Sequence, residues 1–310
     1  MRILVTGGAG FIGSNLVQAL LTGGHEVAVI DNLSSGSPAN IDPRTAFRKL
    51  DILDDATPGF IAEFAPDAVV HLAAQASVSV SVREPDFDRQ VNAEGTRRIA
   101  AAARDAGAKR VISASSAAVY GEPAELPLLE TSRTAPINPY GNSKLEAEGL
   151  LAAELADAGV DYASFRFSNV YGPRQDAEGE GGVVAIFLGR VRAGEAPGIF
   201  GDGSQTRDFI YVGDVVAAIM AALVSEGSLA AQGPAYNIST GHRSSVNELV
   251  GAVRQAAHYF GPVETLEIRQ GDIVHSVLSP QLAEGAFGWK AGVDLDTGVA
   301  LTWRWFSHQG

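Results

Sequence analysis

The sequence predicts an α/β protein in which a doubly wound parallel sheet carries a smaller, interleaved α/β lobe toward the C-terminus. Short, almost wholly apolar runs alternate with helical patterns over the first 170 residues. This alternation is typical of parallel strands that helices cover on both faces. A glycine-rich turn joins the first apolar run to the first helical pattern. The sequence pattern changes after about residue 170.

The elements of the larger domain follow from the spacing of apolar residues. Buried strands are expected where apolar residues run almost continuously, and helices where they recur every three or four positions. The expected strands are 3–5, 26–31, 67–73, 110–116 and 162–168. The expected helices are 11–22, 86–106 and 139–157.

The C-terminal part of the chain is expected to form the smaller lobe. We place the division between the larger domain, 1–168, and the smaller lobe, 169–310. The run at 236–239 predicts a short strand that could return to the main sheet. The segment 207–240 is therefore expected to belong partly to the first domain.

The composition is that of an ordinary globular protein and excludes several kinds of site. Of 310 residues, 46% are hydrophobic and 19% are charged, which suits one large domain or two modest ones. The chain has no cysteine, so disulfides, thiolate nucleophiles and zinc ribbons are excluded, and no metal site is expected. The net charge of −13 argues against nucleic-acid binding.

No membrane segment or targeting peptide is expected either. No apolar run is long enough to span a bilayer. The first strand is expected to begin at Arg2, which leaves no room for a signal peptide before it. A cytoplasmic protein is therefore expected.

The turn after the first strand has the composition of a dinucleotide-binding loop. Gly7, Gly10 and Gly13 give the spacing G-x-x-G-x-x-G between a strand and a helix. Without Cβ atoms, the backbone can turn tightly and approach a pyrophosphate at the positive end of the helix. Asp31 closes the second strand 18 residues after Gly13, where a carboxylate can bond the ribose 2′-hydroxyl and repel the extra phosphate of NADP. The sequence therefore predicts a Rossmann-type domain that binds NAD, with Asp51, at the end of the expected third strand, as a candidate partner of the adenine amine.

A tyrosine and a lysine are paired on the helix that is expected from residue 139. Tyr140 and Lys144 are the only Tyr–Lys pair at i, i+4 in the chain. This spacing places both side chains on one helix face, and an ammonium nearby favours the ionised phenol. A tyrosine that ionises near neutral pH can take a proton from an alcohol. The pair therefore predicts a base for the oxidation of an alcohol.

In this order the motifs resemble the extended short-chain dehydrogenase/reductase family, and within it the nucleotide-sugar epimerase/dehydratase branch. The matching stretches run through essentially the whole chain: TGGAGFIG (6–13), DNLSSG (31–36), HLAA (71–74), SSAAVYG (115–121), PYGNSK (139–144), RFSNVYGPRQ (166–175), GDGSQTRDFIYV (201–212) and RQGD (269–272). The resemblance implies a tightly bound NAD and a nucleotide sugar as the substrate.

The resemblance also implies roles for individual residues. Tyr140 matches the catalytic base, Lys144 the lysine that holds the nicotinamide ribose and lowers the phenol pKa, and Ser116 the residue that bonds the reacting 4-hydroxyl. Further NAD contacts are implied for Phe11, Ile12, Asn32, Ile52, Leu72, Ala73, Ala74, Asn92 and Ser115, although Asn92 is equally well explained as a structural helix residue. Substrate contacts, besides Ser116 and Tyr140, are implied for Asn169, Val184, Arg207, Arg269 and Asp272. Arginine suits phosphate because its planar, permanently charged fork meets two oxygens at once.

The residues after Ser116 narrow the reaction that the resemblance implies. Dehydratases and decarboxylases of the branch carry acidic residues there, whereas this chain has Ala117 and Ala118, which cannot transfer protons. Epimerases that act at C3 and C5 use a cysteine, which this chain lacks. The reaction that the resemblance still implies is NAD-dependent 4-epimerisation of a UDP-hexose through a 4-keto sugar. Asn169 favours a neutral hexose, and the small Ser276, where the family gates the C2 substituent, favours acceptance of N-acetylated hexoses as well.

Three other interpretations stay open. A nucleotide-sugar 4-ketoreductase would release its cofactor in each cycle and prefer NADPH, against which Asp31 argues. A 4-epimerase acting on a UDP-uronate or a dTDP-hexose would use the same catalytic residues. A non-catalytic NAD-binding protein on this fold would not need Ser116, Tyr140 and Lys144 together.

The expected helices 86–106 and 139–157 carry alanine-rich faces. Small side chains let helices pack closely, and related enzymes dimerise through these two helices. A homodimer is therefore expected, although the same faces could simply pack on the sheet.

Overall fold

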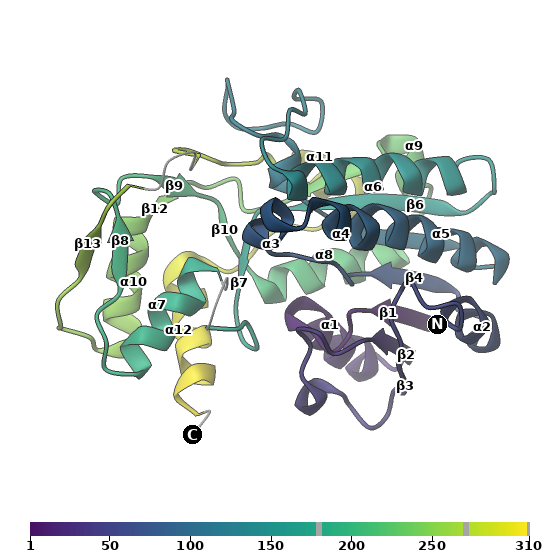
Figure 1. The fold of residues 1–310 in the computed structure, drawn as a ribbon, viewed down its shortest axis with the longest axis horizontal. Helices are drawn as coiled ribbons and strands as arrows, with labels where there is room; N and C mark the ends of the chain where they lie inside the picture. Colours follow the sequence, from purple (N-terminus) through teal and green to yellow (C-terminus); the bar gives the residue numbers. More distant parts are fainter. Residues whose placement is uncertain (178–181, 269–272, 309–310) are drawn as a thin grey trace.

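A seven-stranded parallel sheet forms the centre of the larger part of the molecule (Figure 1). The computed structural model describes residues 1–177, 182–268 and 273–308. The strand order is β11-β6-β5-β4-β1-β2-β3, and every neighbouring pair is parallel. The strands are β1 (Arg2–Thr6), β2 (Glu26–Asp31), β3 (Ala46–Lys49), β4 (Ala68–His71), β5 (Arg110–Ser116), β6 (Asp161–Phe167) and β11 (Ala235–Ile238). The predicted doubly wound α/β class is thereby confirmed.

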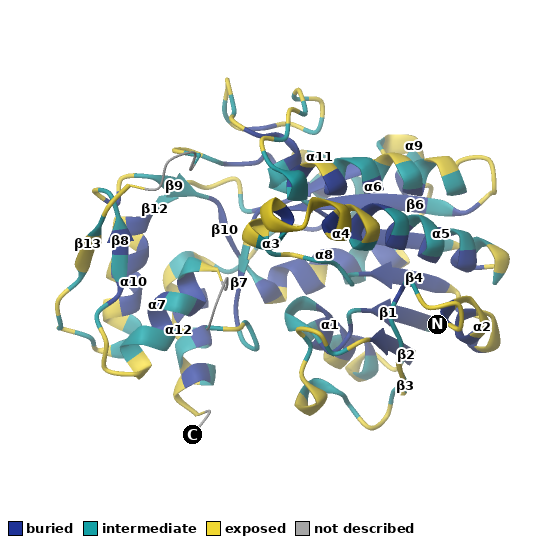
Figure 2. Ribbon diagram, viewed as in Figure 1, coloured by how far each residue is buried: buried dark blue, intermediate teal, exposed yellow. Residues whose placement is uncertain are grey.

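Helices cover both faces of this sheet, because successive side chains of each strand point to opposite sides. Ile3 and Val5 of β1 belong to one core and Leu4 to the other. The first core is closed by α1 (Phe11–Thr22), α8 (Val212–Val224) and α11 (Gln281–Phe287). The second is closed by α2 (Thr57–Phe64), α5 (Gly95–Asp105) and α6 (Pro139–Leu155). Figure 2 shows the strands, apart from the edge strand β3, as the most buried layer between these helices.

One predicted helix, 86–106, is wrong as a single element. The segment is split into α4 (Pro85–Arg89), a π-helical turn (Gln90–Glu94) and α5, and α3 (Val78–Arg83) precedes it. The hydroxyl of Thr96, in the first turn of α5, donates to the carbonyl of Asn92 in the π-helical turn (2.6 Å). Such wide turns inside helices are often found at functional sites, and this one carries Asn92.

The third strand is also shorter than expected, since β3 ends at Lys49 and not at Asp51. Asp51 instead starts a turn. Its Oδ1 accepts the N–H of Leu53 (2.9 Å), and its own N–H donates to Asp54 Oδ2 (2.8 Å). A carboxylate that bonds the backbone two residues on competes with the strand ladder, which ends the strand early.

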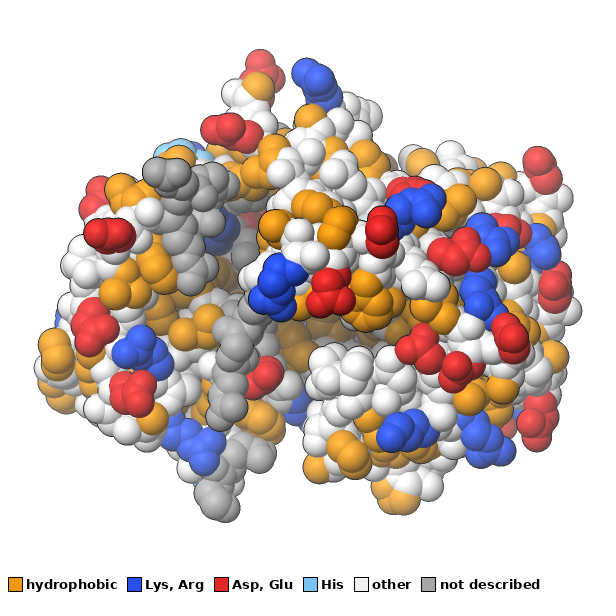
Figure 3. Space-filling view, in the orientation of Figure 1, with side chains coloured by type: hydrophobic (Ala, Val, Ile, Leu, Met, Phe, Trp, Pro, Cys, Tyr) orange, Lys and Arg blue, Asp and Glu red, His pale blue; other side chains and the backbone are white. Residues whose placement is uncertain are grey.

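The C-terminal lobe has a small helical core of its own. It is built by α7 (Val183–Arg192), α10 (Val246–Ala257) and α12 (Leu295–Ser307), whose apolar residues form one cluster. Short strand pairs complete it: β8 (Gly198–Phe200) with β13 (Glu264–Leu266), β7 (Asn169–Tyr171) with β10 (Phe209–Tyr211), and β9 (Thr206–Arg207) with β12 (Ser244–Ser245). In the space-filling view the surface is hollowed between this lobe and the larger domain (Figure 3).

The chain returns to the large sheet after entering the second lobe. Helix α8 packs beside α1, and β11 pairs with β6, with Ala235 opposite Ser164. A short helix, α9 (Leu229–Gln232), joins them. None of the helices in the described ranges has the length and apolarity needed to cross a membrane.

Candidate active site

The glycine loop between β1 and α1 is shaped by close backbone contacts. Gly7 has a φ of +70°, and a Cβ there would lie 2.7 Å from the Ala73 nitrogen. A Cβ on Gly13 would lie 2.1 Å from the Gly7 carbonyl oxygen. Gly10 is the N-cap of α1 and has no side chain to bond the first N–H groups of the helix. The loop therefore presents bare backbone at a positive helix end, which fits a pyrophosphate.

Asp31 lies beside this loop at the end of β2, and its side chain is 7% exposed. Its Oδ2 accepts the N–H of Ala9 (2.9 Å) and its Oδ1 accepts the N–H of Leu33 (2.8 Å). Each carboxylate oxygen keeps a lone pair for a ribose hydroxyl. Next to it, Asn32 donates to Asp51 Oδ2 (2.7 Å). The carboxylate of Asp51 is thus already engaged in the loop, and its predicted bond to adenine stays a prediction.

The predicted cofactor residues that follow β4 form a second wall of the predicted cofactor site, across from Asp31. The N–H of Leu72 donates to the Thr6 carbonyl (3.1 Å), and the N–H of Ala73 lies 3.3 Å from Thr6 Oγ1. These bonds hold the segment 72–74 against Gly7. The remaining predicted side chains are half-buried or buried: Phe11, Ile12 and Ala74 are of intermediate exposure, and Ile52 is 6% exposed.

His71 lies beneath this wall and is 3% exposed. Its ring nitrogens lie within hydrogen-bond distance of Thr6 Oγ1 (2.7 Å) and Thr96 Oγ1 (3.1 Å). Burial, with a smaller contribution from Lys144, lowers the pKa of His71 to about 3. The imidazole is therefore neutral in the folded protein at neutral pH.

We expect His71 to make the protein sensitive to acid. The unfolded chain binds this proton below its ordinary pKa of 6.5, whereas the folded protein binds it only near pH 3. The residue therefore lowers the free energy of unfolding as the pH falls below 6.5, by up to about 1.4 kcal/mol per pH unit. Urea titrations between pH 7.5 and pH 5 would measure this slope, which should be shallower in His71→Gln and unchanged when the exposed His308 is replaced by Gln. Equal slopes for all three proteins would contradict the expectation.

The three predicted catalytic side chains meet where β5 and α6 approach each other. Asn138 caps α6 by accepting the N–H of Gly141 (2.8 Å). The hydroxyl of Tyr140, two residues on, is hydrogen-bonded to the Ser116 hydroxyl at the end of β5. Lys144 is 5% exposed; its Nζ donates to the Ala114 carbonyl (3.1 Å) and lies 6.0 Å from the centroid of the Tyr140 ring. Phenol, hydroxyl and ammonium thus form one cluster.

Burial has the largest effect on the pKa values of this cluster. Burial raises the pKa of the Tyr140 phenol, the bond from Ser116 lowers it, and the charge of Asp88 raises it further, so the net shift is upward. Burial also lowers the pKa of Lys144 to about 8, against the opposing effects of Asp88 and Glu148. Lys144 is not among the groups that cause the net upward shift, so its expected lowering of the phenol pKa stays a prediction.

Two predicted cofactor residues are occupied by protein contacts. Asn92 is 1% exposed, accepts the N–H of Gln75 (2.9 Å), and places its amide nitrogen within 3.1 Å of both Asp88 Oδ1 and Ser143 Oγ. This geometry favours the structural alternative for Asn92. Ser115 donates to Glu148 Oε1 (2.5 Å) on the face of β5 opposite to that of Ser116.

Several buried charged residues around the site were not predicted from the sequence. Asp88 lies four residues before Asn92, and Glu148 four residues after Lys144, so helix spacing could have found both. Glu148 pairs with Arg166 of β6 (2.6 Å), which is 6% exposed. Asp208 is 1% exposed and accepts the N–H groups of Thr240 (2.9 Å) and Gly241 (3.1 Å). No local pattern marks the distant partners of Arg166 and Asp208, because the fold alone brings them together.

The predicted substrate residues are spread over the second lobe. Asn169, at the start of β7, has an exposed side chain. Arg207 lies on β9, where its Nη1 donates to the Thr206 carbonyl (2.9 Å). Val184 is 1% exposed in the core of this lobe, so its side chain has no surface to offer a ligand. Arg269 and Asp272 lie outside the described residues.

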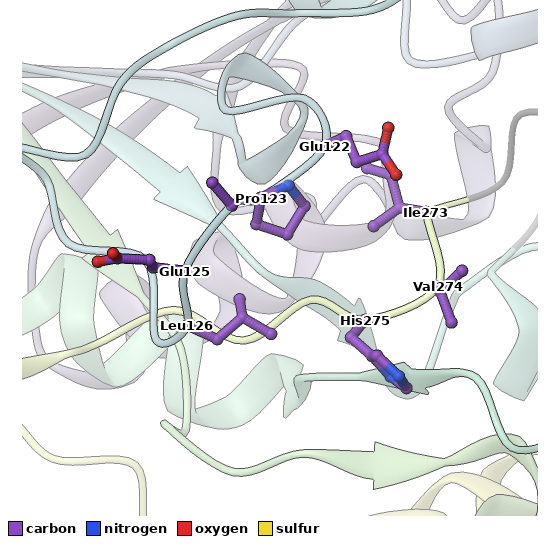
Figure 4. Close-up of a pocket in the computed structure, with 8 residues that line it drawn as sticks. Glu122, Pro123, Glu125, Leu126, Ile273, Val274 and His275 are labelled. Carbon is purple, nitrogen blue, oxygen red and sulfur yellow. The ribbon is translucent and has the colours of Figure 1, made fainter.

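A pocket of about 310 Å³ opens next to Arg207, between the loop that follows Tyr120 and a returning segment (Figure 4). The segment runs beside β9: Ser276 donates its N–H to the Thr206 carbonyl (3.2 Å), and His275 Nδ1 lies 3.0 Å from Thr206 Oγ1. The pocket is lined by Glu122, Pro123, Ala124, Glu125, Leu126, Ile273, Val274 and His275. The sequence analysis singled out none of these residues. Within the described ranges, no group of three or more acidic or histidine side chains could hold a metal ion.

Comparisons with known proteins agree with this geometry. A family model described as the NAD dependent epimerase/dehydratase family matches residues 3–239. A UDP-glucose 4-epimerase from Mycolicibacterium smegmatis is 42% identical over 315 residues, which cover 100% of this chain and 99% of the relative.

Two solved structures are similar over almost their full length. One is a UDP-glucose 4-epimerase from Thermotoga maritima with UDP-glucose (TM-score 0.94, 40% identity, covering 99% of this chain and 98% of the other). The other is a UDP-N-acetylglucosamine 4-epimerase from Methanobrevibacter ruminantium M1 in complex with UDP-N-acetylmuramic acid (TM-score 0.93, 34% identity, covering 100% and 99%). The predicted family resemblance is therefore confirmed: the protein is an NAD-dependent enzyme that belongs to the NAD dependent epimerase/dehydratase family.

Proposed function

We propose that the enzyme interconverts UDP-hexoses that differ in configuration at C4, such as UDP-glucose and UDP-galactose, through a 4-keto sugar. The observation that carries this proposal is the cluster of Ser116, Tyr140 and Lys144, followed by Ala117 and Ala118. The cluster can remove and return one hydroxyl proton, and the two alanines offer no acid or base for chemistry at C5 or C6. The similar enzymes named above include 4-epimerases of UDP-hexoses.

In this mechanism Tyr140 takes the proton of the 4-hydroxyl, and Ser116 holds that hydroxyl through a hydrogen bond. Bound NAD supplies a hydride acceptor and donor at C4 and, in its oxidised form, a positive charge. In the structure, burial and the charge of Asp88 raise the pKa of Tyr140, and the hydrogen bond from Ser116 lowers it. Lys144 keeps its ammonium beside the phenol and has further donors for a ribose hydroxyl.

Epimerisation also requires that the 4-keto sugar present both of its faces to the same hydride donor. We assign the anchoring of the UDP diphosphate to Arg207 and Arg269, and further substrate contacts to Asn169 and Asp272. An anchor at the diphosphate leaves the sugar free to rotate about its linkage. Because Val184 has a buried side chain, only its backbone could contribute to this site.

The test is incubation with a panel of UDP-glucose, UDP-galactose, UDP-glucuronate and dTDP-glucose, with the C4 configuration of the products measured by NMR. Reversible inversion of the UDP-hexoses, with NAD that copurifies and need not be added, is the expected result. Inversion only of the uronate or the dTDP sugar would replace the substrate assignment. Net reduction that consumes added NADPH would replace the epimerase by a ketoreductase.

We further expect N-acetylated hexoses to be accepted. Ser276 is small and partly exposed, and it lies beside the Arg207 strand. The kcat/KM values for UDP-glucose and UDP-N-acetylglucosamine should therefore be comparable. Ser276→Tyr should lower the value for the acetamido sugar by about 100-fold and change that for UDP-glucose far less, while Ser276→Ala should leave both unchanged. Strong rejection of the acetamido sugar by the wild-type enzyme would contradict this expectation.

A homodimer in the cytoplasm also remains a prediction. The alanines of α5 that suggested it, Ala100, Ala102 and Ala103, are buried in the core against the sheet, so they do not by themselves support association. The outer rows of α5 and α6 are joined by ion pairs of Arg97 and Arg104 with Glu154. Sedimentation equilibrium at micromolar concentration would decide between a monomer and a dimer.

A further inference from the structure

A fully buried carboxylate near the catalytic pair has no role in this mechanism. Asp88, on α4, is 0% exposed. Its Oδ1 accepts hydrogen bonds from Gln75 Nε2 (2.6 Å) and Asn92 Nδ2 (3.1 Å). Its Oδ2 is buried and has no hydrogen-bond partner among the described residues. Buried carboxylate oxygens are rarely left unpaired, because desolvation of a charge is costly.

The hydrogen bonds of Asp88 lead toward the catalytic pair. Asn92 also contacts Ser143 Oγ (3.1 Å), which directly precedes Lys144 on α6. Gln75, the other partner, follows the cofactor wall after β4 and donates to the Ser77 carbonyl (2.9 Å). The carboxylate therefore sits between the wall and the helix that carries the base.

The charge of Asp88 acts on both members of the pair. It raises the pKa of Tyr140 and that of Lys144, and its effect on Lys144 is larger than that of Glu148. The remaining titratable group that faces Lys144 is His71 of β4, which is neutral at pH 7 because its pKa is lowered to about 3. Asp88 and Glu148 are therefore the only acidic groups, within the described ranges, that act on the ammonium.

We propose that Asp88 is a positioning residue for the proposed epimerisation: its buried carboxylate is the counter-charge of the Lys144 ammonium, while its Oδ1 holds Gln75 and Asn92 in place. The proposal rests on the function proposed above for Tyr140 and Lys144. It explains why a carboxylate, and not an amide or a hydroxyl, is buried at this position. A structural aspartate would need only the oxygen that accepts the two hydrogen bonds.

The first test is the pH dependence of kcat in Asp88→Asn, which removes the charge and keeps the acceptor oxygen. The alkaline limb of the profile is expected to report the loss of the Lys144 proton. Because Asp88 raises the pKa of Lys144 and that of Tyr140, its removal should shift the limbs of the profile to lower pH. A purely structural loss would lower the maximum without moving the limbs. Asp86→Asn is the matched control, since Asp86 lies exposed on the same helix. The limbs of the pH profile of this variant should not move.

The second test follows Lys144 directly and does not depend on turnover. The chain has four lysines, so selective ¹³C labelling at lysine Cε gives few NMR signals, and Lys144→Met identifies the one of interest. We expect the Lys144 signal to titrate at lower pH in Asp88→Asn than in the wild-type protein at equal cofactor content. The signal in Asp86→Asn should coincide with that of the wild type.

The outcomes separate this proposal from the function on which it rests. Coincident Lys144 titrations in wild type and Asp88→Asn, or unmoved limbs with only a lower maximum, would overturn the positioning role. A wild-type protein that inverts none of the sugars would overturn the proposed function, while the NMR titration would still test the counter-charge. If Asp88→Asn fails to fold, Asp88→Ser removes the charge at smaller volume and allows the same comparison.

Discussion

Replacing Tyr140 by Phe is expected to lower kcat for UDP-glucose by about 10²- to 10⁴-fold, the range that a positioned base supplies. The phenyl ring keeps its place on α6, and only the hydroxyl that bonds Ser116 is lost. The predicted NAD contacts lie mainly on the glycine loop and the walls described above, so the variant should retain its cofactor. The measurement is product formation by NMR, together with NAD released from the denatured protein.

Tyr259→Phe is the matched control for this variant. The hydroxyl of Tyr259 bonds the Pro262 carbonyl (2.7 Å) in the second lobe, away from the Ser116 cluster. The control should keep wild-type kcat. If Tyr140→Phe retained most of its activity, the phenol would not be the base. If the variant lost its NAD, the effect would be structural.

Gly13→Ala is expected to remove most of the bound NAD and to destabilise the fold by about 1–3 kcal/mol, as overpacking does. The added Cβ would lie 2.1 Å from the Gly7 oxygen and 2.8 Å from the Gly8 Cα. Both atoms belong to the backbone, so no side chain can rotate out of the way. The loop must open, which distorts the backbone that faces the pyrophosphate. The measurements are the NAD content and the thermal midpoint of the purified variant.

The same substitution at Gly251 is the control for Gly13→Ala. Gly251 is exposed on α10, and a Cβ there meets no atom within 4 Å. Alanine should therefore stabilise the helix by about 0.5–1 kcal/mol and leave the NAD content unchanged. Normal NAD content and stability in Gly13→Ala would show that the close backbone approach is not what the cofactor requires.

The prediction of helices shows where local pattern was sufficient and where it failed. The helix expected at 11–22 is found with those bounds, and α6 begins at Pro139 as its cap sequence predicts. The helix expected at 86–106 is broken by a π-turn around Asn92. The turn coincides with bonds from Asn92 to Gln75 and Ser143, which lie on other elements. Apolar periodicity carries no information about such distant partners.

The predicted site shows the same division between what local spacing predicts and what only distant contacts decide. The spacing of Tyr140 and Lys144 was enough to pair them, since four residues make one helical turn. Their protonation could not be predicted in this way. Burial raises the pKa of the phenol and lowers that of the lysine. The charge of Asp88 raises both pKa values, and the charge of Glu148 raises that of the lysine. Desolvation depends on everything that covers the helix and has no signature in a short motif.

Local spacing was enough to predict the fold class, the glycine loop, the family and the pairing of Tyr140 with Lys144, because each depends on residues a few positions apart. Tertiary structure decided the rest: it seated Ser116 against Tyr140, engaged both oxygens of Asp31 with the loops, enclosed Val184 in a core and buried Asp88 beside the pair. These contacts join strands and helices that lie far apart in the sequence. The order of strands in the sheet brings them together, and side-chain spacing along the chain does not record that order.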